Sequence, residues 1–375
     1  MEVVRVMTEE NHIRYYLADD DGLPVESVLR FLKFKDNTGY ARNTLRMYCQ
    51  HLKQYFTYLE ERKKEFTDVN IDDLAGFIAW LQNPYIHQKV VPLLNKTARM
   101  PHTVNKTLDA VVTFYDYLTR HGEYEGKLQE ALVKFIRNPG RNYRGFLYGI
   151  AKTKAVKSHV LKLRVPHMVL RTIKREDAAE LLRTCRNLRD YFLLYLLFET
   201  GMRIGEVLSL WLEDFDTSGN AIYLKDRGEL ENQAEIKTVS SPRRLDTTQE
   251  LMDFFTEYVC RFHTEGVETN HVFIKLKGNN VGKAMDYTDV DNLFRTLRRK
   301  TGVAVTPHMF RHTSLSLLYS AGWKPELLRM RAGHKNIYTT INTYVHPSDE
   351  DVAEAFKTIA PVLIPPQTDG EVQRR

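Results

Sequence analysis

The chain has 375 residues, of which 43% are hydrophobic and 27% charged, and its formal net charge is +6. This length suffices for two domains that each bury a core, and the composition excludes a disordered chain. No apolar run approaches the length of a membrane span, and the segment after Met1 lacks a signal-peptide core, so we expect a cytoplasmic protein with no membrane partner.

Positive charge is concentrated in one part of the chain. Twelve Lys or Arg residues and no Asp or Glu lie within Lys134–Arg175, so the rest of the chain has a net charge of −6. Aromatic residues interrupt this segment at Phe135, Tyr143, Phe146 and Tyr148. A run of charged residues can simply be a solvated face, but a run of one sign with interleaved aromatic residues favours binding to a phosphate backbone. We therefore expect double-stranded DNA as the partner.

The first 122 residues predict a small strand pair and a helical domain. Residues 1–24 alternate apolar and polar positions, which predicts two short strands followed by the turn Asp19–Gly22. Residues 25–122 carry apolar residues at helical spacing, which predicts an all-α domain. Its expected helices cover 25–34, 43–59, 69–81 and a segment that runs from Thr103, a candidate N-cap, to Gly122.

Residues 123–171 differ from both flanking regions. They are basic, hold three glycines within 140–149 and have few periodic apolar positions. We expect an interdomain linker that lies along DNA and lets two domains close as a clamp.

Residues 172–347 predict a second domain of the α+β class. Helices are expected over 177–188, 190–199, 251–262 and 287–299, and strands over 221–225, 234–239, 243–246 and 272–274. The fold class is therefore mainly α with a small antiparallel β-sheet. Residues 348–375 are expected to form a C-terminal helix and a polar tail.

The segment Thr306–Pro347 concentrates histidine, arginine and tyrosine at helical spacings. Pro307 suits the first turn of a helix. His308, Arg311 and His312 then fall three and four residues apart, so we expect all three on one face that can grip an anion.

Two glycines divide the rest of this segment. Gly322 predicts the end of the first helix and Gly333 the end of a second one. His334 follows this second stop directly, which places it on a loop, and Tyr344 lies beyond a threonine-rich stretch.

Each of these residues also has an ordinary structural interpretation. His308 and His312 could bind zinc, but Met309 replaces the glutamate that a metallohydrolase helix carries, so we expect no metal and no cofactor. Taken singly, arginines are usually on the surface and tyrosines are often core aromatics, and only the combination indicates chemistry. The cysteines are far apart and expected as reduced thiols: Cys49, Cys185 and Cys260.

Together the motifs resemble the tyrosine recombinases of the phage integrase family, which break and rejoin DNA through a phosphotyrosine. That family carries H-x-x-R on a helix, then a Gly-His after a helix-turn-helix, then the nucleophile. Here these are His308–Arg311, Gly333–His334 and Tyr344, ten residues after His334. The family's earlier arginine motif, T-G-x-R-x-x-E, stands at Thr200–Glu206. The chain most resembles the transposase A branch, encoded by site-specific transposons.

The resemblance implies roles for both domains and for six residues. Residues 25–122 would be a SAM-like core-binding domain and residues 172–347 the catalytic domain. The implied catalytic set is Arg203, Lys237, His308, Arg311, His334 and the nucleophile Tyr344.

Some of these positions have close alternatives. Arg203 could form a local pair with Glu206, three residues later. Lys237 matches the family's strand lysine better than Lys225, although a strand lysine beside DNA can be a simple phosphate contact. A further tyrosine, Tyr338, follows His334 by only four residues and is expected to pack as an apolar plug, so spacing favours Tyr344.

The expected chemistry follows from the weakness of a phenol as a nucleophile. A tyrosine ionises only near pH ~10, so attack on phosphorus needs help. Arg203, Arg311, His308 and His334 would stabilise the pentavalent transition state, and Lys237 would protonate the leaving 5′ oxygen. The 3′-phosphotyrosyl product stores the bond energy, so a second strand can reverse the step. We expect a site-specific recombinase or transposase.

The family resemblance also implies an assembly. We expect a homotetramer on two DNA sites, nucleoid-associated when bound, with partner recombinases or accessory proteins as further candidates. The helix after the tyrosine packs onto a neighbouring subunit in the family, although its apolar stripe could equally cover its own domain. The alternative functions are a type IB topoisomerase, which shares this chemistry, and a DNA-binding protein without activity.

Overall fold

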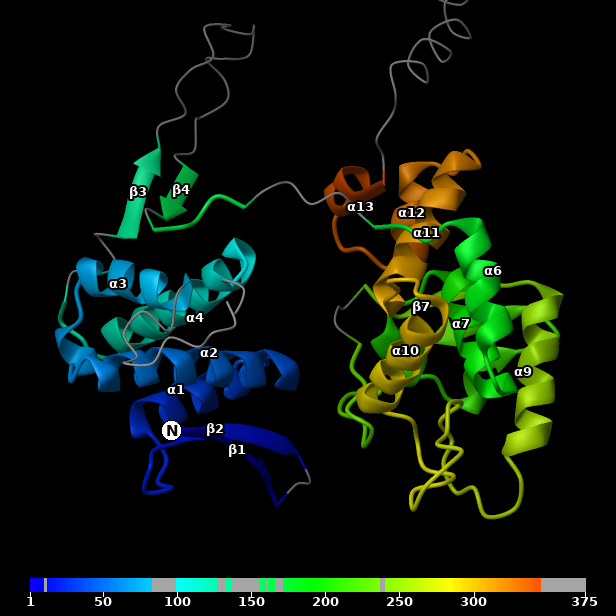
Figure 1. The fold of residues 1–375 in the computed structure, drawn as a ribbon, viewed down its shortest axis with the longest axis horizontal. Coiled ribbons are helices and arrows are strands. Elements are labelled where there is room, and N and C mark those ends of the chain that lie inside the picture. Colours follow the sequence, from blue (N-terminus) through cyan, green and yellow to red (C-terminus); the bar gives the residue numbers. More distant parts are fainter. Residues whose placement is uncertain are drawn as a thin grey trace, which may run out of the picture. The chain divides into compact units, whose positions relative to one another are not determined.

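The computed structural model describes most of the chain, in two compact units, Met1–Met168 and Val169–Arg375, each with its own apolar core (Figure 1). The described residues are 1–9, 12–82, 99–126, 128, 132–136, 156–159, 161–165, 171–236 and 240–344. Within these ranges, the structure contains no helix that is long and apolar enough to span a bilayer.

Over its described residues, the N-terminal unit combines the predicted strand pair with four long helices. Its strands β1 (Glu2–Met7) and β2 (Ile13–Ala18) pair antiparallel, with Met7 opposite Ile13. The helices are α1 (Glu26–Asn37), α2 (Arg42–Glu61), α3 (Ile71–Gln82) and α4 (Pro101–Arg120). Helix α2 contacts the other three and the strand pair. The core is rich in aromatic side chains, among them Phe31, Tyr55, Phe77, Phe114 and Tyr115.

Helix α4 begins before the cap that the sequence predicts. Pro101 occupies its first turn, where a missing backbone N–H costs nothing. Thr103 therefore lies inside the helix, and its carbonyl accepts a hydrogen bond from Thr107 Oγ1 at 3.1 Å. The prediction of Thr103 as the N-cap was wrong because the proline start carries the stronger signal.

The described part of the expected linker is folded. A strand β3 (Val133–Ile136) pairs antiparallel with β4 (Val156–His159). Tyr124, Leu128 and Leu132 are buried in the N-terminal core. The Asn105 side chain also exchanges two hydrogen bonds of 2.9 Å with the backbone of Leu163. These contacts attach parts of residues 123–171 to the N-terminal unit. The interdomain linker stays a prediction, and the stretch with three glycines lies outside the described residues.

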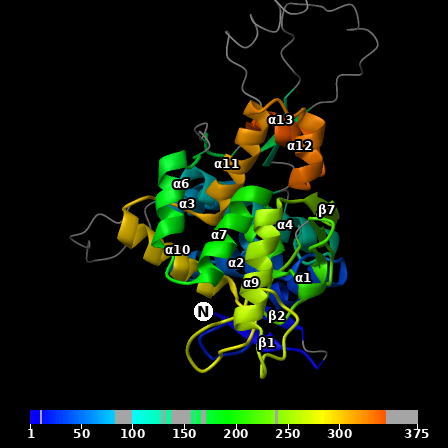
Figure 2. The same ribbon diagram turned by 90° about the vertical axis from the view of Figure 1, so that its right-hand side faces the viewer.

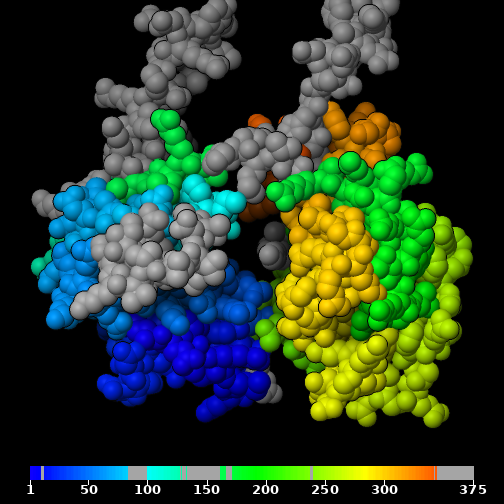
Figure 3. All heavy atoms as spheres, in the orientation of Figure 1, coloured from blue at the N-terminus to red at the C-terminus, as the bar shows by residue number. Residues whose placement is uncertain are grey.

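The second unit is built around one buried helix. Helix α7 (Leu188–Thr200) is flanked by α6 (Arg175–Thr184) and α9 (Gln249–Phe262), and it also contacts α11 (Pro307–Ser320) (Figures 1 and 2). Five of its apolar residues are fully buried, which explains its nearly continuous apolar sequence: Phe192, Leu193, Leu194, Leu196 and Leu197. The remaining helices are α8 (Ile204–Leu208), α10 (Tyr287–Thr301), α12 (Pro325–Ala332) and α13 (Ile337–Tyr344). Helices α6 and α10 lie side by side at the surface (Figure 3).

Within the described residues, the sheet of this unit has three strands in the order β5 (Phe215–Asp216), β6 (Ala221–Leu224) and β7 (Arg243–Asp246). Two of the predicted strands are therefore present, but residues 234–236 do not form the third one. The Asn232 side chain instead holds that loop through 2.9 Å hydrogen bonds to the carbonyls of Leu208 and Met285. The predicted strand at 272–274 is buried, but within the described residues its only strand-like pairing is an isolated bridge between Ile274 and Ala284.

Candidate active site

Arg203 occupies the N-cap of α8, where the chain turns after α7. Gly201, with φ of 64°, ends α7 in the left-handed region that glycine tolerates. The backbone N–H of Arg203 donates to Glu206 Oε2 at 2.9 Å, and its Nη1 donates to Oε1 at 2.7 Å. The local Arg–Glu pair that the sequence allowed is therefore present.

Glu206 anchors a second arginine that the sequence analysis missed. Its side chain is fully buried, and Arg243, at the start of β7, donates from Nη2 to Oε2 at 3.0 Å and from Nη1 to Oε1 at 3.2 Å. Burial by itself would raise the pKa of Glu206, but the ion pairs with Arg243 and Arg203 lower this pKa to about 2. The carboxylate is therefore charged at neutral pH and holds both guanidinium groups.

Arg311 connects three segments from inside the unit. Its side chain is 1% exposed. It donates from Nη1 to the carbonyl of Gly201 at 2.8 Å, and from Nη2 to the carbonyl of Ala332 at 2.5 Å and to His334 Nε2 at 3.0 Å. Arg311 thus joins the end of α7 to the end of α12 and to the histidine that follows.

His334 lies directly after the αL stop at Gly333, as predicted. Because the Arg311 guanidinium can only donate, His334 Nε2 accepts, and the ring proton belongs on Nδ1, which lies 2.9 Å from Thr340 Oγ1. Burial, with the positive charge of Arg311, Arg203 and Arg243 nearby, lowers the pKa of His334 to about 4. The ring is therefore neutral at neutral pH.

The first turn of α11 differs from the single anion-gripping face that we expected. His308 is exposed, whereas Arg311 and His312 are buried, and the two imidazole centroids lie 4.4 Å apart. Burial and the nearby charge of His308 and Arg311 lower the pKa of His312 to about 4. Helical spacing correctly brings the two imidazoles together, but it did not predict how deeply each side chain is buried.

The structure brings three of the six predicted residues together around Gly333. Arg203 Nη2 lies 3.4 Å from the carbonyl oxygen of Gly333, which also accepts from Ser240 Oγ at 3.3 Å. These three residues, Arg203, Arg311 and His334, are called the arginine–histidine cluster below. The cluster lies near the starts of α8 and α11 and just after the end of α12.

The other predicted residues are placed less completely. His308 is in the first turn of α11, and Lys237 lies outside the described residues, three positions before Ser240. Tyr344 is the last residue of α13, four positions after the buried Thr340. Tyr338 is 67% exposed, so the prediction that it packs as an apolar plug was wrong.

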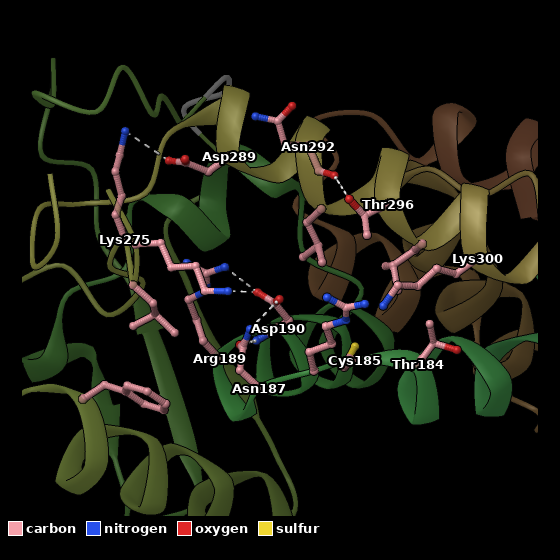
Figure 4. Close-up of a pocket in the computed structure, with 16 residues that line it drawn as sticks. Thr184, Cys185, Asn187, Arg189, Asp190, Lys275, Asp289, Asn292, Thr296 and Lys300 are labelled. Carbon is pink, nitrogen blue, oxygen red and sulfur yellow. Dashed lines mark hydrogen bonds and ion pairs between the residues drawn. The ribbon is translucent and has the colours of Figure 1, made fainter. Parts of the chain in front are cut away.

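A cleft of about 600 Å³ lies elsewhere in this unit, between the α6–α7 junction and α10 (Figure 4). None of the six predicted catalytic residues lines it. Ion pairs between Arg189 and Asp190 at 2.6 Å and between Lys275 and Asp289 at 3.2 Å occupy its walls. Over the described part of the chain, no three His, Cys, Asp or Glu residues are grouped as a potential metal site.

Comparisons with known proteins cover nearly the whole chain. The phage integrase family profile matches residues 171–351, and the profile of the phage integrase N-terminal SAM-like domain matches residues 29–122. Transposase A from transposon Tn554 of Staphylococcus aureus is 38% identical over 357 residues, which span 95% of this chain and 97% of that protein. Tyrosine recombinase XerC of Staphylococcus aureus (strain JH9) is 21% identical over 339 residues, 90% of this chain and 96% of that protein.

Solved structures show the same fold. The Tn1549 transposon integrase, in complex with a circular intermediate DNA, matches with a TM-score of 0.61 at 16% identity, over 89% of this chain and 99% of that one. XerH site-specific recombinase bound to a palindromic difH substrate matches with a TM-score of 0.57 at 15% identity, over 90% of this chain and 84% of that one.

Proposed function

Because the chain belongs to the phage integrase family and is a site-specific tyrosine recombinase, we propose that Tyr344 is its nucleophile and that the arginine–histidine cluster binds the phosphate it attacks. The family assignment favours neither a type IB topoisomerase nor an inactive DNA-binding protein. The likeness to transposase A suggests transposition as the use of this chemistry.

The observation that carries the proposal is the meeting of Arg203, Arg311 and His334 around Gly333. A guanidinium has five N–H donors, and Arg203 uses two of its side-chain nitrogens on Glu206 and Gly333 among the described residues. Its side chain is 19% exposed, so donors remain for a phosphate that reaches the surface.

His334 would change its role when a phosphate arrives. In the structure its Nε2 accepts from Arg311 at 3.0 Å. A phosphate oxygen at this place would take that N–H of Arg311, and its negative charge would favour protonation of His334 at Nε2. Both side chains would then donate to the phosphate, which is the arrangement that stabilises charge in the transition state.

The bond changes balance without any further reactant. The Tyr344 oxygen forms a bond to phosphorus while the bond from phosphorus to the 5′ oxygen breaks. We assign the protonation of that 5′ oxygen to Lys237, and His308, exposed on α11, takes the proton of the tyrosine. The product is a 3′-phosphotyrosyl link and a free 5′ hydroxyl. The reverse reaction with another strand's 5′ hydroxyl completes the exchange.

The test is covalent attachment to a nicked DNA substrate that cannot religate, in excess EDTA. Tyr344→Phe removes one oxygen, so attachment should vanish while DNA binding and folding survive. Tyr338→Phe is a matched control because this exposed side chain also follows His334, and attachment should remain. Peptide mapping by mass spectrometry identifies the attached residue. An adduct on Tyr338, or attachment that needs added magnesium, would refute the proposal.

We also assign sequence-independent DNA affinity to Lys134–Arg175, with its twelve positive charges. Each phosphate contact contributes a slope of about −0.9 to the dependence of log affinity on log salt concentration. Replacing six of these residues by Gln should weaken binding to all DNA sequences alike and flatten the slope by several units. Lys162 is left unchanged in this variant because it pairs with Asp109 at 2.8 Å. An unchanged slope would place the contact surface elsewhere.

On DNA we propose a homotetramer that holds two recombination sites. This stoichiometry follows from the need to exchange four strands with one nucleophile per subunit. Light scattering of the complex with Tyr344→Phe, which stops before cleavage, measures it directly. A dimer at saturating protein would contradict the proposed tetramer. If the complex forms only when a cell extract is added, accessory proteins are required.

A further inference from the structure

We propose that Arg243 is a positioning residue of this active site, which acts by fixing Glu206 behind Arg203 and by fixing the turn that carries His334. The inference rests on the proposed function, and it concerns a residue outside the predicted catalytic set. Arg243 begins β7, and its side chain is 9% exposed.

One guanidinium group contacts three separate segments of the unit. Nη1 and Nη2 donate to the two oxygens of Glu206 in α8. Nε donates to the carbonyl of Arg331 in α12 at 2.8 Å, and Nη1 also donates to the carbonyl of Ser241 at 2.7 Å. Only the planar guanidinium of arginine has N–H donors that point in these separate directions, because lysine carries a single ammonium nitrogen.

The first contact controls the orientation of Arg203. Glu206 accepts from the backbone and the Nη1 of Arg203 while Arg243 grips both of its oxygens from another side. Without Arg243 the carboxylate keeps, among the described residues, only Arg203 as an ionic partner and can rotate with it. The donors of Arg203 would then lose the direction that a phosphate requires.

The second contact controls the turn at Gly333. The bond to Arg331 holds the last turn of α12, two residues before Gly333. A Cβ atom at Gly333 would lie 2.7 Å from Arg243 Nη1 and 3.2 Å from the Ser240 carbonyl, so the two segments are packed against each other here. Arg243 thus sets the position from which His334 meets Arg311.

A purely structural role is the competing explanation, and it predicts different kinetics. If Arg243 only stabilised the fold, its loss would slow cleavage by the same factor whether or not Arg203 is present. If it acts in part by orienting Arg203, its loss should cost less once Arg203 is gone, because interacting residues give non-additive effects.

The experiment measures the rate of covalent attachment by the full-length chain at saturating DNA. Arg243→Gln should slow attachment about 10-fold to 100-fold with DNA affinity retained, because a small misplacement of catalytic groups costs that much. Arg243→Lys should recover only part of the rate. Arg244→Gln is the matched control, since this adjacent arginine is 53% exposed and pairs with Asp246 at 2.9 Å. It should cleave at the wild-type rate.

The decisive comparison is Arg203→Ala alone against Arg203→Ala combined with Arg243→Gln. A smaller loss from Arg243→Gln in the Arg203→Ala background than in the wild-type background supports the positioning role. If Arg243→Gln slows cleavage by the same factor in both backgrounds, the positioning role is overturned. Cleavage at the wild-type rate by Arg243→Gln would overturn it too, as would loss of DNA binding by both Arg243 variants. Attachment by the wild-type chain and its absence in Tyr344→Phe are recorded in the same series, so a failure of the proposed function is seen separately.

Discussion

Replacing Glu206 by Gln removes one buried negative charge from between two partly buried arginines. The carboxylate accepts four hydrogen bonds, of 2.7 and 2.9 Å from Arg203 and of 3.0 and 3.2 Å from Arg243. Breaking a buried ion pair on one side costs about 3–5 kcal/mol, because the remaining charge has no partner. Arg203 is 19% exposed and gains some compensation from water, so we take the lower end, about 3 kcal/mol.

This loss should appear as a fall in melting temperature. For a unit of this size, 1 kcal/mol corresponds to about 2–4 °C, so Glu206→Gln should lower the Tm of the catalytic unit by about 6–12 °C. The pKa of Glu206 is lowered to about 2 from 4.5, so its stabilisation is present above pH 4.5 and is lost as the pH falls toward 2. The difference between variant and wild type should therefore shrink over that range.

The assay is calorimetric unfolding of the full chain at several pH values. Each unit has its own apolar core, so only the transition of the catalytic unit should move. Glu257→Gln is the matched control, because Glu257 is 59% exposed and lies 3.7 Å from Arg261, an arrangement worth about 0–1 kcal/mol. If Glu206→Gln lowers the Tm no further than this control, the carboxylate does not hold the two arginines as we argue.

Two further predictions concern the turn and the histidines of the site. Gly333→Ala should lower the Tm more than Gly302→Ala. Both glycines have positive φ, 60° and 70°, but only the Cβ at position 333 would collide with Arg243, at 2.7 Å. Equal losses would show that Arg243 moves aside easily. His312 and His334, with pKa values lowered to about 4 from 6.5, should make the free energy of unfolding fall as the pH drops from 6.5 to 4, since the unfolded chain takes up their protons first. Ring pKa values near 6.5 in an NMR titration would contradict this.

Local signals predicted most of the elements and part of the site. The spacing of apolar residues located the long helices, and the stops at Gly201 and Gly333 placed Arg203 and His334 at helix ends, as the structure has them. These features depend on residues within one or two turns of each other. Sequence patterns are informative at that range.

Contacts between distant segments could not be predicted. Arg243 meets Glu206 and Arg331 across 37 and 88 positions of the chain, and nothing in its neighbourhood indicates these partners. The burial of Arg311 has the same origin, since its acceptors are Gly201, which caps α7, and Ala332, at the end of α12. Strand β5 has two residues and is too short to show an alternating pattern.

The hydrogen bond between His334 Nδ1 and Thr340 Oγ1 connects the cluster to helix α13 at a point one turn before Tyr344. Thr340 is fully buried, so this contact is shielded from water. Any ligand that reorients the imidazole therefore changes the free energy with which α13 is held in place. Thermodynamic reciprocity requires the converse, so whatever shifts α13 must alter anion affinity by the same factor. A contact that shifts α13 would thereby change the affinity of the arginine–histidine cluster for a phosphate without touching the DNA.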